Sequence, residues 1–86
     1  MSLKKFFDSK LHRQIIIFFR ENPHSIDSPR GIATWTGLSR SRTRKALDDL
    51  VKAGILNSIS TPSTSGYSFT QDVKIIDTIK EYLEKK

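Results

Sequence analysis

Four of the six residues from Arg40 to Lys45 carry a positive charge, which makes this the densest group of chemically distinctive side chains in the sequence. Arg30 is the nearest cation before them, and no acid lies between Arg30 and Lys45. A guanidinium can pair with two phosphate oxygens or with O6 and N7 of guanine, and an ammonium contacts phosphate as a point charge. The cluster is typical of a surface that binds a polyanion, most often nucleic acid; the alternative is a solvated face that keeps a small protein soluble.

The positive charge is concentrated in the first half of the chain. The 86 residues have a formal net charge of +6, with ten basic and three acidic residues in 1–45 against five and six in 46–86. Any polyanion-binding surface is therefore expected in the first half.

Other site chemistry has little support. The chain has no cysteine, and His12 and His24 belong to no cluster with metal-ligand spacing. The four glycines form no phosphate-binding loop. Asp48 and Asp49 are adjacent, so on a helix they diverge by about 100°. We predict no catalytic residue, no metal and no cofactor, and we do not expect an enzyme.

The chain also has no segment that predicts a membrane span. Its longest apolar run is 15–19, whereas a membrane-spanning helix needs about 20 apolar residues. Charges interrupt the first residues, which argues against a signal peptide. We expect a cytoplasmic protein with no membrane partner.

The elements that must position the basic cluster are helices. Leu11, Ile15 and Phe19 recur at helical spacing, and this helix should end at Asn22-Pro23. After a linker over 24–27, Ser28-Pro29 predicts a short second helix that Gly37 ends. Ser39 is expected to cap a third helix over 39–53, which Gly54 ends.

The pattern changes after Gly54. Residues 55–61 and 67–70 alternate apolar and polar side chains around a polar loop, which predicts a β-hairpin. Thr70 is expected to cap a final helix that runs to about Glu84. Its apolar stripe would consist of Val73, Ile76, Ile79 and Leu83.

Three stretches, 13–23, 31–41 and 45–56, look like the first core helix, the helix-turn-helix and the start of the wing of a known family. The sequence resembles the winged helix-turn-helix domains of prokaryotic transcription regulators, of the MarR-like and ArsR-like kind. The resemblance implies an α+β fold with a three-helix core, a β-hairpin wing and a C-terminal helix. One domain would occupy 1–86, with its core at about 11–70 and the last helix at about 71–84.

The resemblance further implies a transcriptional regulator that binds double-stranded DNA with helix 39–53 in the major groove. The expected DNA-binding residues of that helix are Ser39, Arg40, Ser41, Arg42, Arg44 and Lys45. Ser28 and Arg30 would hold a phosphate at the start of the second helix. Ser63, Thr64 and Ser65 would form the wing tip, which departs from the family's common pattern because it carries no Arg or Lys.

The order of charges along helix 39–53 points the same way without the resemblance. The helix macrodipole favours acids in the first turn and bases in the last, whereas here the bases come first and Asp48 and Asp49 follow. Bound phosphates would remove the penalty. The alternative is that these acids pair with Arg44 or Lys45 one turn away as surface ion pairs.

The chain has more apolar side chains than one small core needs. The surplus predicts a homodimer through the first and last helices, or else packing of these helices on each other within one chain. The expected interface residues are Phe6, Phe7, Ile17, Phe18, Trp35, Ile75 and Tyr82. Together with the uncharged wing, they also favour an alternative function, a winged-helix protein–protein interaction module within a larger complex.

Overall fold

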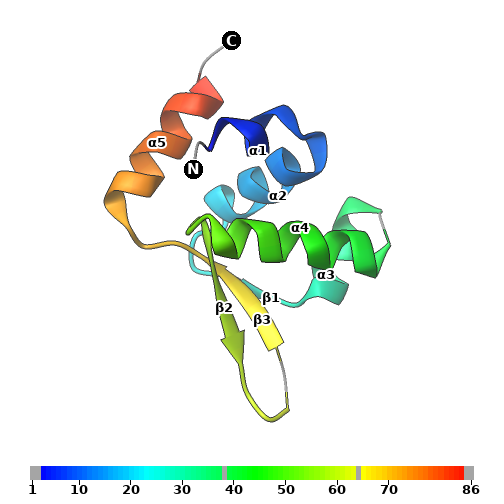
Figure 1. Ribbon diagram of the computed structural model, residues 1–86. Helices are drawn as coiled ribbons and strands as arrows, with labels where there is room; N and C mark the ends of the chain where they lie inside the picture. Colours follow the sequence, from blue (N-terminus) through cyan, green and yellow to red (C-terminus); the bar gives the residue numbers. More distant parts are fainter. Residues whose placement is uncertain (1–2, 38, 64, 85–86) are drawn as a thin grey trace.

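Five helices and a three-stranded antiparallel sheet make up residues 3–37, 39–63 and 65–84, which the computed structural model describes (Figure 1). In chain order these are α1 (Lys4–Asp8), α2 (Lys10–Glu21), β1 (Ile26–Asp27), α3 (Pro29–Thr36), α4 (Arg40–Lys52), β2 (Leu56–Ser60), β3 (Ser65–Phe69) and α5 (Val73–Glu84). Helices α2, α3 and α4 form the core, β2 and β3 the wing, and α5 the C-terminal helix. The predicted α+β winged helix-turn-helix fold is confirmed.

Local capping sets the bounds of α3 and α4, as the sequence predicts. The hydroxyls of Ser28 and Ser39 each accept a hydrogen bond from the backbone N–H three residues on, at 3.1 and 3.3 Å. Pro29 stands in the first turn of α3. Gly37 and Gly54 follow the two helices with φ of 76° and 82°, a left-handed conformation that strains any residue with a Cβ.

The N-terminal residues form a separate short helix that the sequence analysis did not predict. Ser9 divides α1 from α2, and its hydroxyl accepts a hydrogen bond from the N–H of His12 at 3.4 Å. Phe6 of α1 is only 4% exposed and belongs to the core. Its prediction as a dimer-interface residue is therefore wrong, because the ring is already buried within one chain.

The predicted linker over 24–27 contains a third strand. Ile26 of β1 pairs with Ser68 of β3, and Asp27 pairs with Tyr67, so the strand order is β1-β3-β2. A strand of two residues is too short to show alternation in the sequence. Gly66 permits the close approach of β1, because a Cβ there would lie 2.9 Å from Cγ2 of Ile26.

One apolar core joins the helices to the sheet. It consists of Phe6, Ile15, Ile16, Phe19, Ile32, Ala46, Leu47, Leu50, Ile55, Leu56, Tyr67, Phe69 and Ile79. The wing is therefore not an appendage: its strands supply Leu56, Tyr67 and Phe69 to the core that holds α4.

The start of α5 differs from the prediction that Thr70 caps it. Asp72 occupies the cap, since its carboxylate accepts a hydrogen bond from the N–H of Lys74 at 2.9 Å. Thr70 instead accepts from the N–H of Asp72 at 3.1 Å, which holds the turn before the helix. Val73, expected on the buried stripe, is 68% exposed because the first turn of α5 extends beyond the core.

The burial of α5 yields a paired stability prediction. Ile79→Ala should lower the free energy of unfolding by about 2–5 kcal/mol, because it opens a cavity at a fully buried site. Val73→Ala should change it by less than about 0.5 kcal/mol. Urea denaturation of both variants measures this, and equal losses would contradict the orientation of α5.

Candidate nucleic-acid interface

Helix α4 crosses the front of the molecule with most of its polar side exposed. In Figure 1 it lies between α1 above and the β2–β3 hairpin below. Thr43, Ala46, Leu47 and Leu50 are buried against the rest of the core, and this stripe fixes the rotation of the helix about its axis. The exposed side therefore has two edges, one toward the wing and α3 and the other toward α1.

The edge toward the wing forms a groove in which several predicted DNA-binding residues meet. Ser28, Pro29, Arg30, Arg40, Ser41, Arg44 and Ser65 line this wing-side groove, whose volume is about 590 Å³. They come from α3 and its cap, α4 and the start of β3. The groove thus joins the consecutive helices α3 and α4 to the wing strand β3, with three arginines and three serine hydroxyls around it.

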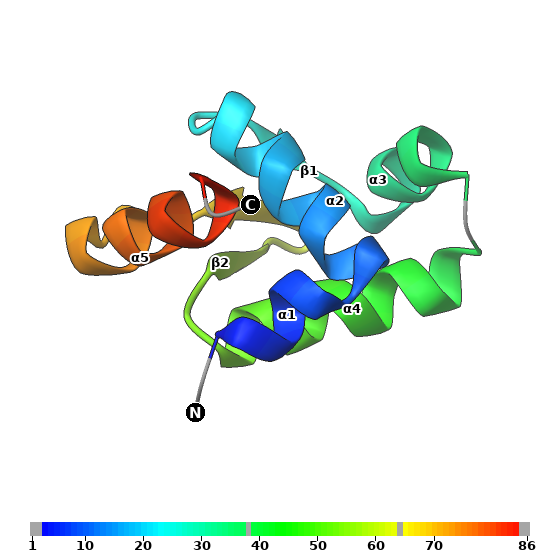
Figure 2. The same cartoon turned by 90° about the horizontal axis from the view of Figure 1, so that it is seen from above.

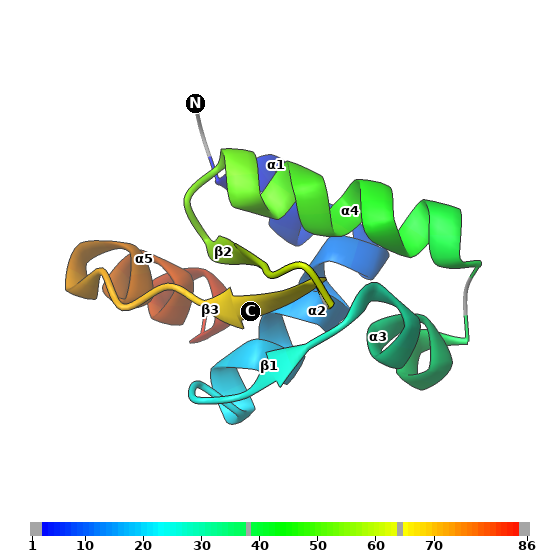
Figure 3. The same cartoon turned by 90° about the horizontal axis from the view of Figure 1, so that it is seen from below.

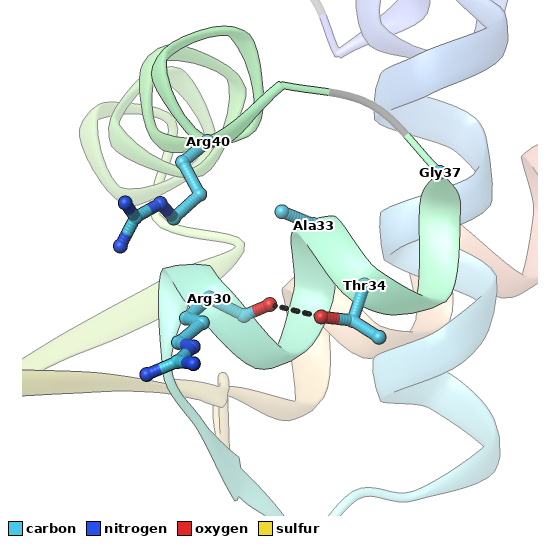
Figure 4. Close-up of a pocket in the computed structure, with 5 residues that line it drawn as sticks. All are labelled: Arg30, Ala33, Thr34, Gly37 and Arg40. Carbon is cyan, nitrogen blue, oxygen red and sulfur yellow. Dashed lines mark hydrogen bonds between the residues drawn. The ribbon is translucent and has the colours of Figure 1, made fainter.

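Two of these arginines, Arg30 and Arg40, extend their side chains in the same direction. Figure 4 shows the guanidinium groups of Arg30 and Arg40 extending to the same side of a hollow between the starts of α3 and α4. Thr34 donates a hydrogen bond from its hydroxyl to the backbone carbonyl of Arg30 at 2.9 Å. That bond uses the main chain only, so the Arg30 guanidinium stays available to a ligand.

No carboxylate within the described residues forms an ion pair with the basic residues predicted to bind DNA, which are Arg30, Arg40, Arg42, Arg44 and Lys45. The alternative interpretation, in which Asp48 or Asp49 pairs with Arg44 or Lys45 one turn away, finds no such ion pair among these residues. Asp48 instead accepts a hydrogen bond from the hydroxyl of Tyr67 at 2.9 Å, and Asp49 lies 3.2 Å from Nε2 of His12. The bases at the start of α4 therefore keep the unfavourable macrodipole position without a local counter-charge.

The remaining predicted residues are distributed elsewhere. Arg42 lies on the opposite edge, in a hollow with Lys10 and Thr36, and Lys45 lies toward α1. Ser39 is an exposed helix cap. Ser63 is exposed near the wing tip, and Thr64 lies outside the described residues.

Tyr67 ties the wing to the exposed side of α4. Burial raises the pKa of its phenol above the ordinary value of 10.0, and the hydrogen bond to Asp48 and the negative charge of that carboxylate raise this pKa further. The positive charge of Arg44 acts on the same pKa in the opposite direction. The contact fixes the wing beside Arg44 and holds Asp48 at the same time.

Two features of this surface escaped the sequence analysis. Lys5 and Lys52 join Lys45 on the α1 side, and the spacing of Lys45 and Lys52, which lie about 20° apart around the helix, was a signal for part of this set. The contact between His12 and Asp49 joins residues 37 positions apart, and no local pattern indicates it. Within the described ranges, no group of three His, Cys, Asp or Glu side chains could hold a metal ion.

The pKa of Tyr67 gives a prediction for alkaline pH. Because the folded-state pKa lies above the unfolded one, the stabilising contribution of Tyr67 is fully present below about pH 10 and is lost as the pH rises through the folded-state value. The stability difference between wild type and Tyr67→Phe should therefore shrink above pH 10. Urea denaturation of both proteins between pH 8 and 11 measures it. A difference independent of pH would contradict the assignment.

Comparison with known proteins gives no match to a family model and no significantly similar curated protein. In the part of the chain that the structure describes, no helix is long and apolar enough to cross a membrane.

Three solved structures share the fold. A mutant of ZitR from Lactococcus lactis superposes with a TM-score of 0.66 at 20% identity, over 87% of this chain and 50% of that chain. RV1404 from Mycobacterium tuberculosis superposes with a TM-score of 0.66 at 17% identity, over 86% of this chain and 52% of that chain. A possible transcriptional regulator from Methanosarcina mazei Go1 superposes with a TM-score of 0.70 at 14% identity, over 95% of this chain and 73% of that chain. The chain spans about half the length of the first two, and the likeness to all three establishes the winged-helix fold.

Proposed function

We propose that this protein is a transcriptional regulator that binds double-stranded DNA by inserting α4 into the major groove. The observation that carries the proposal is the wing-side groove, where Arg30, Arg40 and Arg44 converge without a carboxylate partner among the described residues. An arginine-rich groove beside an exposed helix suits a phosphate backbone and the base edges next to it. The description of the Methanosarcina mazei structure as a possible transcriptional regulator supports the same class of function.

The roles of the residues follow from their positions. Arg40 and Arg44 lie one turn apart in the N-terminal half of α4, where a helix in the major groove reaches base edges. Arg30 and the cap of Ser28 stand at the start of α3 and would contact a phosphate. Phosphate neutralisation would supply affinity, and the α4 arginines would supply specificity. Ser65 would add a hydroxyl contact from the wing.

Alanine substitutions test these roles. Arg40→Ala or Arg44→Ala should cost about 1–3 kcal/mol of binding if the arginine pairs with a base, with discrimination lost at particular positions. Arg30→Ala should weaken binding to all DNA sequences alike. It should also reduce the slope of log K against log salt by about 0.9, the contribution of one phosphate contact. Fluorescence anisotropy with labelled duplexes at several salt concentrations measures both effects.

The matched control is Arg20→Ala, because Arg20 lies in the last turn of α2, at the end directed away from α4 (Figure 2). It removes the same charge and should change affinity by less than about twofold. Equal losses for Arg20→Ala and Arg44→Ala would contradict the proposed face.

A homodimer is the proposed assembly, because a two-fold dimer would read two half-sites about 10 base pairs apart. The predicted interface residues fall into two separate groups. Phe7 stacks on Tyr82 at 4.8 Å where α1 meets α5, and Ile75 of α5 is half-buried. Phe18 meets Trp35 at 5.1 Å between α2 and α3.

Figure 1 shows α3 and α5 at opposite ends of the molecule, so a single two-fold dimer contact would use only one of the two groups. We assign it to α1 and α5, where the half-buried Ile17 would also contribute.

The second group gives the alternative function its support. Trp35 is 53% exposed although it is the largest apolar side chain in the sequence. An exposed tryptophan beside a half-buried phenylalanine is the kind of anchor that protein interfaces use. A protein-interaction module would therefore bind its partner at Trp35.

Sedimentation velocity separates the two groups. Tyr82→Ala should weaken a wild-type dimer by tenfold or more, because aromatic anchors dominate such interfaces, whereas Trp35→Ala should leave it intact. Circular dichroism checks that both variants fold. A wild type that stays monomeric at all concentrations would contradict the dimer, and dissociation by Trp35→Ala alone would reverse the assignment of the two groups.

A further inference from the structure

A second cationic surface lies on the edge of α4 that faces α1. Lys5 of α1 and Lys45 and Lys52 of α4 line a hollow of about 330 Å³. Figure 2 shows α1 running beside α4 on this side. All three lysines are exposed, and in the described part of the chain none of them pairs with a carboxylate. We call this the α1-side hollow.

The acid in the α1-side hollow is already engaged. Asp49 lies there with its Oδ2 atom 3.2 Å from Nε2 of His12, whose Nδ1 atom lies 2.7 Å from the hydroxyl of Ser9. The imidazole is thus held at both nitrogens and keeps the carboxylate directed toward α2. The lysines around it remain without a counter-ion, so the hollow has a net positive charge.

The spacing along α4 extends this surface into a row. Arg42, Lys45 and Lys52 stand at i, i+3 and i+10, which spreads them over about 80° of the helix surface and about 15 Å of its length. Lys45 and Lys52 lie near the middle of the exposed side and line the α1-side hollow, whereas Arg42 lies at its far edge in a separate hollow. Arg40 and Arg44 lie along the other edge, beside Arg30. The helix therefore carries cations across its whole exposed side, and Lys5 adds one from a different helix.

This arrangement matches the two walls of a major groove. A helix with its side chains is about 10–12 Å wide and fills a groove about 12 Å wide, with one phosphate backbone on each flank. Cations on one edge therefore reach one strand, and cations on the other edge reach its complement.

We propose that Lys5, Lys45 and Lys52 bind phosphates of the DNA strand on the α1 side, which makes α1 part of the DNA-binding surface. The proposal rests on the proposed function and adds a second row of contacts, contributed by an element outside the helix-turn-helix. These contacts carry no base information, so they raise the affinity for all duplexes equally.

Charge-removing substitutions test the row on a random 30-base-pair duplex between 50 and 200 mM salt. Lys5→Gln and Lys52→Gln should each weaken binding about three- to tenfold at 50 mM, and each should reduce the slope of log K against log salt by about 0.9. The matched control is Lys80→Gln on α5, which removes the same charge from an exposed residue outside the hollow and should change affinity by less than about twofold.

A gain of binding gives an independent readout. Asp49→Asn removes the negative charge from the hollow and should tighten binding by about two- to fivefold at 50 mM salt. Asp77→Asn removes the same charge from exposed α5 and should have less than half of that effect. Circular dichroism confirms that each variant is folded.

The outcomes separate this proposal from the one on which it rests. If Lys5→Gln and Lys52→Gln behave like Lys80→Gln while Arg40→Ala and Arg44→Ala lose binding, the second row is wrong and the DNA-binding function stands. If the folded wild type binds no duplex at 50 mM salt, both proposals fail. Inorganic phosphate that saturates the hollow below 1 mM without DNA, followed by the His12 NMR signal and abolished by Lys5→Gln, would assign it to a small anion and overturn the DNA contact.

Discussion

The burial of one narrow stripe of α4 is the constraint on which the arrangement of charge depends. Thr43, Ala46, Leu47 and Leu50 are at most 2% exposed, and the last three belong to the core that also contains residues of α1, α2, α3, the wing strands and α5. A helix whose buried stripe is fixed has no rotational freedom, so every other residue of α4 takes a determined direction. The arginines cannot turn inward, so their side chains leave the helix on its exposed side.

The separation of opposite charges depends on two contacts that leave the helix. Asp48 and Asp49 stand one turn from Arg44 and Lys45, where surface ion pairs form readily. Tyr67 of the wing and His12 of α2 engage these two carboxylates instead. Each contact joins α4 to another element and also leaves a neighbouring cation without a partner. Tertiary structure therefore preserves a local charge imbalance that an isolated helix would tend to relieve. A functional site is expected where a sequence keeps such an unfavourable local arrangement.

The features of the fold that could be read from the sequence are those set by local geometry. Ser28, Ser39, Gly37 and Gly54 act within one turn of themselves, so their residue types sufficed to place the ends of α3 and α4. β1 could not be predicted, because its two residues form a strand only through pairing with β3 across about forty positions. The start of α5 was misplaced since Thr70 and Asp72 are both competent caps, and the packing of the chain decides between them.

In the candidate site, too, the features set locally could be predicted from the sequence, and those set by distant contacts could not. The wing-side groove was predictable residue by residue, since Arg30, Arg40 and Arg44 each follow a recognisable helix start, but their convergence with Ser65 required the wing to fold back beside α4. Phe6 was misassigned to an interface because a separate α1, created by the cap at Ser9, folds it into the core.

The two edges of α4 differ in what they can recognise. The wing-side edge carries arginines, whose rigid forks favour paired acceptors, and it is enclosed by elements that fix their approach. The α1 side carries Lys45 and Lys52, which act as flexible point charges and tolerate any phosphate position, and Arg42 lies beyond them. Under the proposed function, Lys45 and Lys52 would contact phosphates on the α1 side, and Arg40 and Arg44 would read sequence on the wing side. The asymmetry follows from residue types on a single helix, and the burial of the opposite stripe is what presents both edges at once.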